Sequence, residues 1–218
     1  MFVGGEFYYD PAWRVEHPVI DTSRMTFLNG GQACLIVICD ALREKGIDRI
    51  LLPSYLCPTI VNTLEKCGLA CGYYQVNPDL STDLEDLAGK AQGFRAVYFI
   101  NYFGFPRSRK ELALLRSLRQ NGVLLVEDNA QFGFSEPGTG DFVFNSMRKL
   151  CAYDGGYLYS AIEVDPFIDK RKGQPNRRLP LIRQYRARLA DYLFKGKGDR
   201  EELNSLYERA EQNYESDT

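Results

Sequence analysis

The residues best suited to chemistry lie between Val123 and Tyr157. An apolar run that ends in Glu127 and Asp128 has the pattern of a buried strand, and a loop rich in glycine and proline follows it. A second apolar run then leads to Lys149. A carboxylate at the end of a strand, facing an amine across a loop, is the arrangement that a cofactor reacting through a carbonyl group needs.

Each of these charged residues also has a simpler interpretation. Side chains alternate along a strand, so only one of Glu127 and Asp128 can face a site, and Asp128 could instead cap a helix or lie on the surface. The apolar residues before Lys149 and the glycine pair after it favour a place in a site over a surface position. Ser146 and Lys149 have the SxxK spacing of penicillin-recognising serine hydrolases. No SDN or KTG motif follows them, so we do not assign that chemistry.

A second candidate is the sequence Gly30-Gly31-Gln32, which precedes an apolar segment typical of a buried helix. The first N–H groups of a helix have no partner within it, and together with the helix dipole they attract phosphate. The spacing is neither GxGxxG nor that of a Walker loop, which argues against a dinucleotide- or ATP-binding site. A simple glycine turn is the alternative.

The surrounding segments alternate between strand and helix patterns. Strands are predicted at 49–52, 70–76, 96–101, 123–127 and 142–144, and helices at 30–45, 58–66, 83–90 and 108–120. This alternation predicts an α/β fold with a mostly parallel central sheet and helices on both faces. Ligands of such sheets lie beyond the carboxyl ends of the strands, which places Ser54, Asn101 and Asp128 near one edge.

Composition excludes several classes of protein. The net charge of −2 gives no basic field for nucleic acid, and no apolar run is long enough, at about 18 residues, to span a membrane. The N-terminus lacks the features of a signal peptide, so we expect a cytoplasmic protein. Six cysteines without a CxxC pair, and a single histidine, argue against a metal site, a disulfide framework and Ser-His-Asp chemistry.

The pattern changes after residue 160. We predict one domain over 1–160 and a helical extension over 161–218, with a basic helix at 181–194 and a charged helix at 201–213. The basic helix carries Arg183, Arg186 and Arg188. It could contact an anionic polymer, but no DNA- or RNA-binding module accompanies it, so we favour a solvated helix face.

Taken in order, five segments between Phe27 and Tyr159 resemble the sugar aminotransferases of the DegT/DnrJ/StrS family, which depend on pyridoxal phosphate (PLP). They are FLNGGQACL, ILLPSYLCPTIVNTL, YFINYFGFP, VEDNAQ, and FNSMRKL followed by DGG. The resemblance implies the large-domain architecture of PLP-dependent transferases and a homodimer. It also implies transfer of an amino group from an amino-acid donor to a keto sugar, with a nucleotide-linked sugar as the expected substrate, in polysaccharide or secondary-metabolite biosynthesis.

The resemblance also implies roles for individual residues near the cofactor ring. Lys149 would bond to the aldehyde of PLP and, once released, act as general base in the 1,3-proton shift. Asp128 would pair with the pyridine nitrogen and keep it protonated, so that the ring accepts electrons. Gln131 would lie beside the phenolic oxygen of the ring.

Other implied cofactor contacts include departures from the family pattern. Ser146 and the backbone around Gly31 and Gln32 would hold the phosphate, although the family has a threonine where this chain has Gln32. The aromatic residue that stacks on the ring is replaced by Cys57, and Tyr55 is a nearby substitute.

Family members continue into a substantial C-terminal domain, whereas only two more helices are predicted here. The resemblance therefore implies that 161–218 is the beginning of an incomplete C-terminal part. We expect a transaminase if the missing part is supplied. The alternative is a non-catalytic or truncated PLP-fold protein that acts as a partner subunit.

Overall fold

The computed structural model describes residues 23–132, 138–149, 154–170 and 177–216. Within these ranges, seven strands form one sheet in the order β1-β7-β6-β5-β4-β2-β3. The strands are β1 (Thr26–Leu28), β2 (Arg49–Pro53), β3 (Ala70–Tyr74), β4 (Ala96–Ile100), β5 (Leu124–Asp128), β6 (Phe142–Phe144) and β7 (Gly156–Ser160). The strands from β6 to β3 pair in parallel, and β7 and β1 add antiparallel pairs at the other edge.

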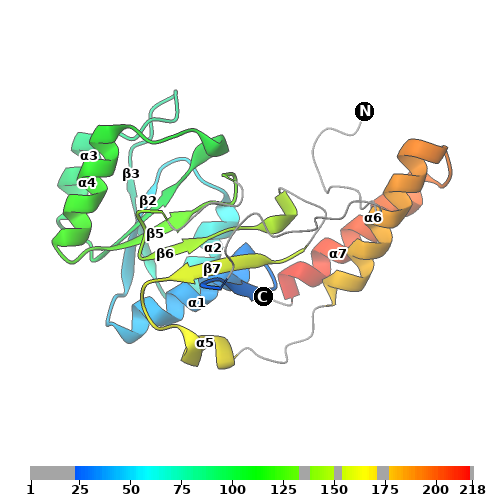
Figure 1. The fold of residues 1–218 in the computed structure, drawn as a ribbon, viewed down its shortest axis with the longest axis horizontal. Helices are drawn as coiled ribbons and strands as arrows, with labels where there is room; N and C mark the ends of the chain where they lie inside the picture. Colours follow the sequence, from blue (N-terminus) through cyan, green and yellow to red (C-terminus); the bar gives the residue numbers. More distant parts are fainter. Residues whose placement is uncertain (1–22, 133–137, 150–153, 171–176, 217–218) are drawn as a thin grey trace.

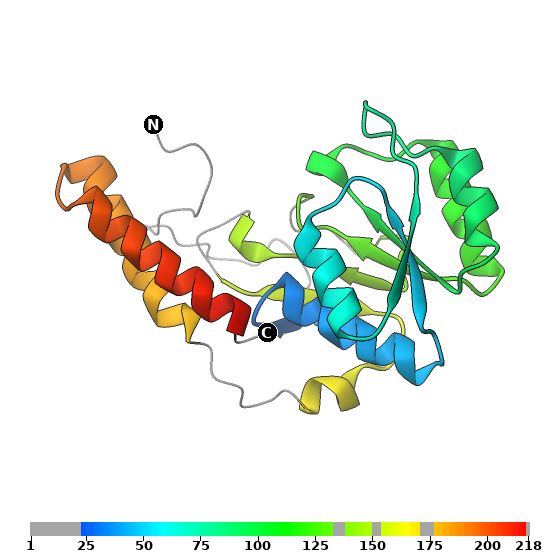
Figure 2. The same ribbon diagram turned by 180° about the vertical axis from the view of Figure 1, so that it is seen from behind.

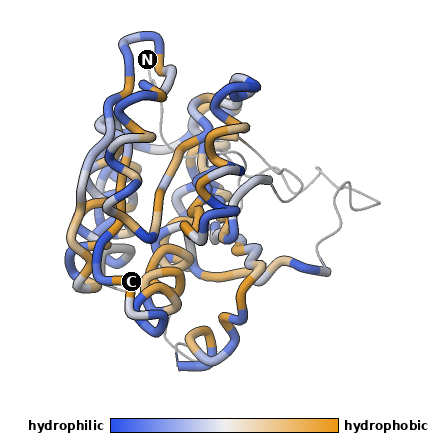
Figure 3. The backbone as a smooth tube through the Cα atoms, turned by 90° about the vertical axis from the view of Figure 1, so that its left-hand side faces the viewer, coloured by the Kyte–Doolittle hydropathy of each residue, from blue (hydrophilic) through white to orange (hydrophobic). Residues whose placement is uncertain are grey.

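Helices cover both faces of this sheet (Figures 1 and 2). They are α1 (Gly31–Glu44), α2 (Pro58–Lys66), α3 (Leu84–Ala91), α4 (Arg109–Gln120), α5 (Asp165–Asp169), α6 (Arg178–Lys195) and α7 (Arg200–Ser216). One apolar core joins α1, α2 and α5 to the sheet, and a second core joins α3 and α4 to the opposite face. The apolar residues gather along the strands between these layers (Figure 3).

The predicted fold class is confirmed. The structure has each predicted element, and α2 has the predicted bounds, with Pro58 at its first turn. The sequence interpretation missed β1, β7 and α5. The two strands are three and five residues long, and they are defined by their antiparallel pairing at the sheet edge rather than by their own pattern.

The C-terminal helices α6 and α7 pack against each other around their own apolar cluster, which includes Ile182 and Leu203. Figure 1 shows this pair extending away from the sheet. The expectation of a solvated basic face on α6 was wrong for Arg186, which is buried and forms an ion pair with Asp154. The division at residue 160 stays a prediction.

Gly156, the first residue of β7, allows a close approach between β7 and the start of α1. A Cβ atom at this position would lie 2.5 Å from the carbonyl oxygen of Asn145 and 2.7 Å from the carbonyl carbon of Gly30. Both neighbours are backbone atoms that a side-chain rotation cannot move. A glycine is therefore required where the sheet meets the first turn of α1.

We predict that Gly156→Ala lowers the free energy of unfolding by about 2–3 kcal/mol, because the new methyl group displaces backbone on two elements. The matched control is Gly89→Ala in α3, where a Cβ meets nothing within 4 Å. Alanine should stabilise that helix by about 0.5–1 kcal/mol. Urea unfolding followed by circular dichroism measures both, and an equal effect of the two substitutions would contradict the packing argument.

Candidate functional site

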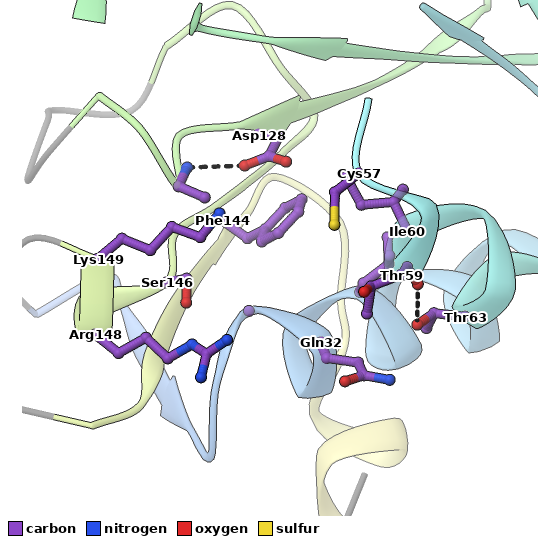
Figure 4. A pocket seen from close by; sticks show the side chains of 13 residues that line it. Gln32, Cys57, Thr59, Ile60, Thr63, Asp128, Phe144, Ser146, Arg148 and Lys149 are labelled. Carbon is purple, nitrogen blue, oxygen red and sulfur yellow. Dashed lines mark hydrogen bonds between the residues drawn. The ribbon is translucent and has the colours of Figure 1, made fainter. Parts of the chain in front are cut away.

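Two adjoining cavities lie at the carboxyl ends of β2, β5 and β6. The first is lined by Gly31, Gln32, Leu35, Cys57, Thr59, Ile60, Thr63, Asp128, Ala130, Phe144, Ser146, Arg148 and Lys149. The second is lined by Tyr55, Leu56, Cys57, Ile60, Ile100, Tyr102, Asp128, Ala130, Gln131 and Lys149. Each residue to which the resemblance gives a role at the cofactor lines at least one of them, and Asp128, Lys149 and Cys57 line both. Figure 4 shows the first cavity.

Asp128 ends β5 with a side chain that is almost wholly buried, at 4% exposure. One carboxylate oxygen accepts a hydrogen bond from the Tyr98 hydroxyl at 2.5 Å, and the other accepts from the Ala130 N–H at 2.8 Å. Burial raises the pKa of Asp128, while the two hydrogen bonds and the charge of Lys149 partly oppose that increase. The carboxylate is therefore held in place at an energetic cost.

Glu127 points to the other side of β5, as strand alternation predicts. Its carboxylate accepts from the Asn101 side chain and from the N–H of Gly140, both at 2.9 Å. Asn101 and Ser54 lie at the same sheet edge, but neither lines the two cavities. Ser54 instead accepts a hydrogen bond from the N–H of Val76. Of the predicted edge residues, Asp128 alone faces this site.

The first turn of α1 forms one end of the first cavity. Its N-cap residue, Gly30, makes no side-chain capping bond, and no acidic residue lies in the first turn. By contrast, the Asp83 carboxylate caps α3. A Cβ on Gly31 would lie 3.1 Å from the Cβ of Ser146, so the missing side chain lets the serine approach the helix. This end of the cavity presents a hydroxyl and a positive helix terminus.

The Gln32 side chain lies elsewhere. Figure 4 shows it on the α2 side of the cavity rather than beside Ser146. The backbone of the first turn, and not the Gln32 amide, is therefore the part placed to meet an anion next to Ser146.

Lys149 comes from the 3₁₀ turn η2 (Met147–Lys149), which follows β6. The Met147 N–H donates to the Gly155 carbonyl at 2.9 Å, and the Lys149 N–H donates to the Ser146 carbonyl at 3.2 Å. In Figure 4 the lysine side chain extends from this turn toward Asp128. An amine and a carboxylate from different strand ends thus meet in one cavity.

Gln131, Tyr55 and Cys57 contribute to the second cavity. The Gln131 side-chain oxygen accepts from the Phe103 N–H at 3.0 Å, which fixes the amide. The Tyr55 side chain is 57% exposed, and its ring centroid is 5.8 Å from that of Tyr102. Tyr102 lines the cavity as well. Two tyrosines therefore lie in the same cavity as Cys57, which stands where the family has an aromatic ring.

Sequence reasoning missed several residues of the site, among them Tyr98, Tyr102, Ala130 and Arg148. Tyr98 could have been found, because it is two residues before Ile100, which pairs in register with Asp128. Alternation then places the tyrosine on the same face as the carboxylate. Arg148 stands next to Lys149 in the sequence, but no sequence pattern indicates its partner, Glu211.

The described residues contain no group of three or more His, Cys, Asp or Glu side chains that could hold a metal ion. Among the same residues, no helix is both long and apolar enough to cross a membrane.

No family model matches the chain. A dTDP-4-dehydro-2,3,6-trideoxy-D-glucose 4-aminotransferase from Saccharopolyspora spinosa is 30% identical over 166 residues, which cover 71% of this chain and 42% of that protein. The chain therefore spans less than half the length of this curated relative.

Solved structures share the fold. The sugar aminotransferase CalS13 from Micromonospora echinospora has a TM-score of 0.54 and 22% identity, over 78% of this chain and 48% of that chain. A DegT DnrJ EryC1 StrS aminotransferase from Brucella abortus has a TM-score of 0.54 and 17% identity, over 69% and 45%. A histidinol-phosphate aminotransferase from Clostridium acetobutylicum has a TM-score of 0.56 and 16% identity, over 70% and 49%.

The raised pKa of Asp128 predicts a pH-dependent cost to stability. A native pKa above the usual 3.8 means that the folded chain binds the proton more tightly, so stability is lost as the pH rises through the native pKa. We predict that Asp128→Asn stabilises the chain at pH 7 by about 1 kcal/mol, or about 2–4 °C in Tm. This gain should vanish as the pH falls below 3.8.

Thermal melts at several pH values measure this effect. The control is Asp48→Asn at an exposed position, which should change stability by less than about 0.5 kcal/mol at every pH. A loss of stability in Asp128→Asn that does not vary with pH would show that the hydrogen bonds outweigh the cost of burial.

Proposed function

We propose that this chain, which is 30% identical to a sugar aminotransferase over 71% of its length, is the PLP-binding large domain of an enzyme of the DegT/DnrJ/StrS family. It transfers an amino group from an amino-acid donor to a keto sugar, most simply a nucleotide-linked one. The observation that carries this proposal is the meeting of Asp128, Lys149 and the uncapped start of α1 around one cavity, in a chain 30% identical to a sugar aminotransferase.

The residues present fit the cofactor. PLP offers a ring nitrogen, an aldehyde and a phosphate, and the cavity presents a carboxylate, an amine and a helix terminus with a hydroxyl. When bound, the group supplies an electron sink for a carbanion next to nitrogen. Asp128 would hold the proton on the ring nitrogen, Lys149 would bond to the aldehyde and later move a proton, and Ser146 would hold the phosphate.

The environment of Asp128 supports its role. A carboxylate buried this deeply is costly without a cation beside it, and a protonated ring nitrogen is such a cation. The hydrogen bonds from Tyr98 and Ala130 fix both oxygens, so the carboxylate does not need to reorient when the ring enters. Gln131, anchored by Phe103, and the tyrosines Tyr55 and Tyr102 would then lie around the ring.

We propose a homodimer, a cytoplasmic location and a large domain that ends near residue 160, as the sequence interpretation predicted. A second candidate is a PLP-binding partner subunit without turnover of its own, and it is favoured by Cys57, which stands where the family has the aromatic residue that stacks on the cofactor ring.

We predict that the chain incubated with PLP gains the yellow colour of a lysine-bound cofactor, and that borohydride fixes one cofactor on Lys149. Lys149→Ala should lose both signals, because the described residues that line the first cavity include no other lysine. Lys195→Ala, which removes an exposed lysine paired with Asp191 on α6, is the matched control and should keep both. Absorbance and peptide mass spectrometry measure the outcome, and labelling at a different lysine would overturn the assignment.

The two candidates differ in a half-reaction. If the chain is catalytic, adding L-glutamate to the PLP-loaded protein should convert the cofactor to its amine form and yield 2-oxoglutarate. Chromatography of the released cofactor measures this conversion. A protein that keeps PLP on Lys149 but leaves it unchanged after many hours with glutamate would be the non-catalytic partner subunit.

A further inference from the structure

We propose that Arg148 binds the phosphate group of the cofactor, and that Glu211 of α7 is the positioning residue for its guanidinium. This inference rests on the proposed function. It adds a ligand to the Ser146 and α1 pair, and it gives the C-terminal helices a part in cofactor binding.

Arg148 lies where a phosphate ligand is needed. It lines the first cavity together with Gly31 and Ser146, and its side chain is 24% exposed. Figure 4 shows the side chain extending from η2 toward the start of α1, while the neighbouring Lys149 extends toward Asp128. Adjacent residues of one turn thus reach the two ends of the cavity. A guanidinium is suited to this position, because its planar donors match phosphate oxygens.

Glu211 of α7 holds the Arg148 guanidinium. One nitrogen of Arg148 donates to both carboxylate oxygens of Glu211, at 2.8 and 3.1 Å. The same carboxylate accepts two bonds from Arg178 of α6, at 3.0 and 3.2 Å. Glu211 therefore joins the guanidinium of the cavity to a second guanidinium whose side chain is only 1% exposed.

Asp154 connects these ion pairs to the turn η2. This carboxylate, with a side chain 3% exposed, pairs with both Arg178 and Arg186 of α6. The next residue, Gly155, accepts the N–H of Met147 in η2. The chain of contacts thus begins and ends at the turn that carries Arg148. Breaking one member of a buried ion pair leaves the other without compensation, so such a cluster resists rearrangement.

This arrangement couples the place of α7 to the anion-binding end of the cavity. If α7 shifted, Glu211 would move and the Arg148 guanidinium would lose its anchor. An arginine that merely braced η2 would show no preference for ligands with a phosphate group, and this difference makes the proposal testable.

The experiment compares PLP with pyridoxal, which has the same ring and aldehyde without the phosphate. Dissociation constants come from fluorescence titration of the full chain. We expect Arg148→Gln to raise the Kd for PLP about 10- to 100-fold and to leave the Kd for pyridoxal within about twofold. We expect Arg148→Lys, which keeps the charge without the fork, to fall between wild type and Arg148→Gln.

The positioning role has its own matched pair. Glu211→Gln should raise the Kd for PLP about 3- to 10-fold, because the guanidinium loses its charged anchor. Glu202→Gln removes an acid of the same helix that pairs with Arg188 at an exposed site, and it should leave the Kd unchanged. Circular dichroism shows whether each variant is folded. If Arg148→Gln does not fold, the Kd values of Arg148→Lys for PLP and pyridoxal provide the test.

The outcomes separate this inference from the proposed function. A wild-type chain that retains no PLP on dialysis overturns the proposed function. A wild-type chain that binds PLP, with equal affinity in Arg148→Gln, overturns the inference alone. An equal loss for PLP and pyridoxal would make Arg148 a brace of the turn. Weaker binding of dTDP with unchanged binding of PLP would assign the guanidinium to a substrate diphosphate and would also overturn it.

Discussion

The burial of one carboxylate at the end of β5 is the constraint on which this site depends. Asp128 loses hydration there, and the Tyr98 hydroxyl and the Ala130 N–H only partly compensate, so its pKa is raised. A cation bound next to this carboxylate would offset the free-energy cost of its burial. The neighbouring Glu127 points to the other side of the strand and ties the loop at Gly140, which leaves the cavity face to Asp128.

Close backbone approach is the second requirement. Gly156 allows β7 to contact the first turn of α1, and Gly31 allows Ser146 to approach the same turn. Because glycine has no side chain at these two positions, the start of α1, the Ser146 hydroxyl and the start of β7 lie close together. The anion-binding end of the cavity follows from this packing, because the N-cap residue of α1 is a glycine, which has no side chain to cap the first N–H groups.

The pair of C-terminal helices also contacts the turn η2 beside the site, through Glu211 of α7. α6 and α7 bury their own apolar cluster, yet their charged residues reach back to η2 through Asp154 and Glu211. Arginines that look like a solvated basic stretch in the sequence are divided between a buried network and an exposed pair with Glu202. Charge patterns along one helix do not reveal which of these a residue joins, because the partner comes from another element.

The sequence by itself determined the alternating elements, the sheet that they form and the placement of Asp128, Ser146 and Lys149 at strand ends. Hydrophobic period and turn residues report the local environment of each position, and that information is carried by neighbouring residues. Tertiary structure decided the partners. Tyr98 and Asp128 are 30 positions apart, and Arg148 and Glu211 are 63 apart. Such pairs arise from packing between elements, which no local period encodes.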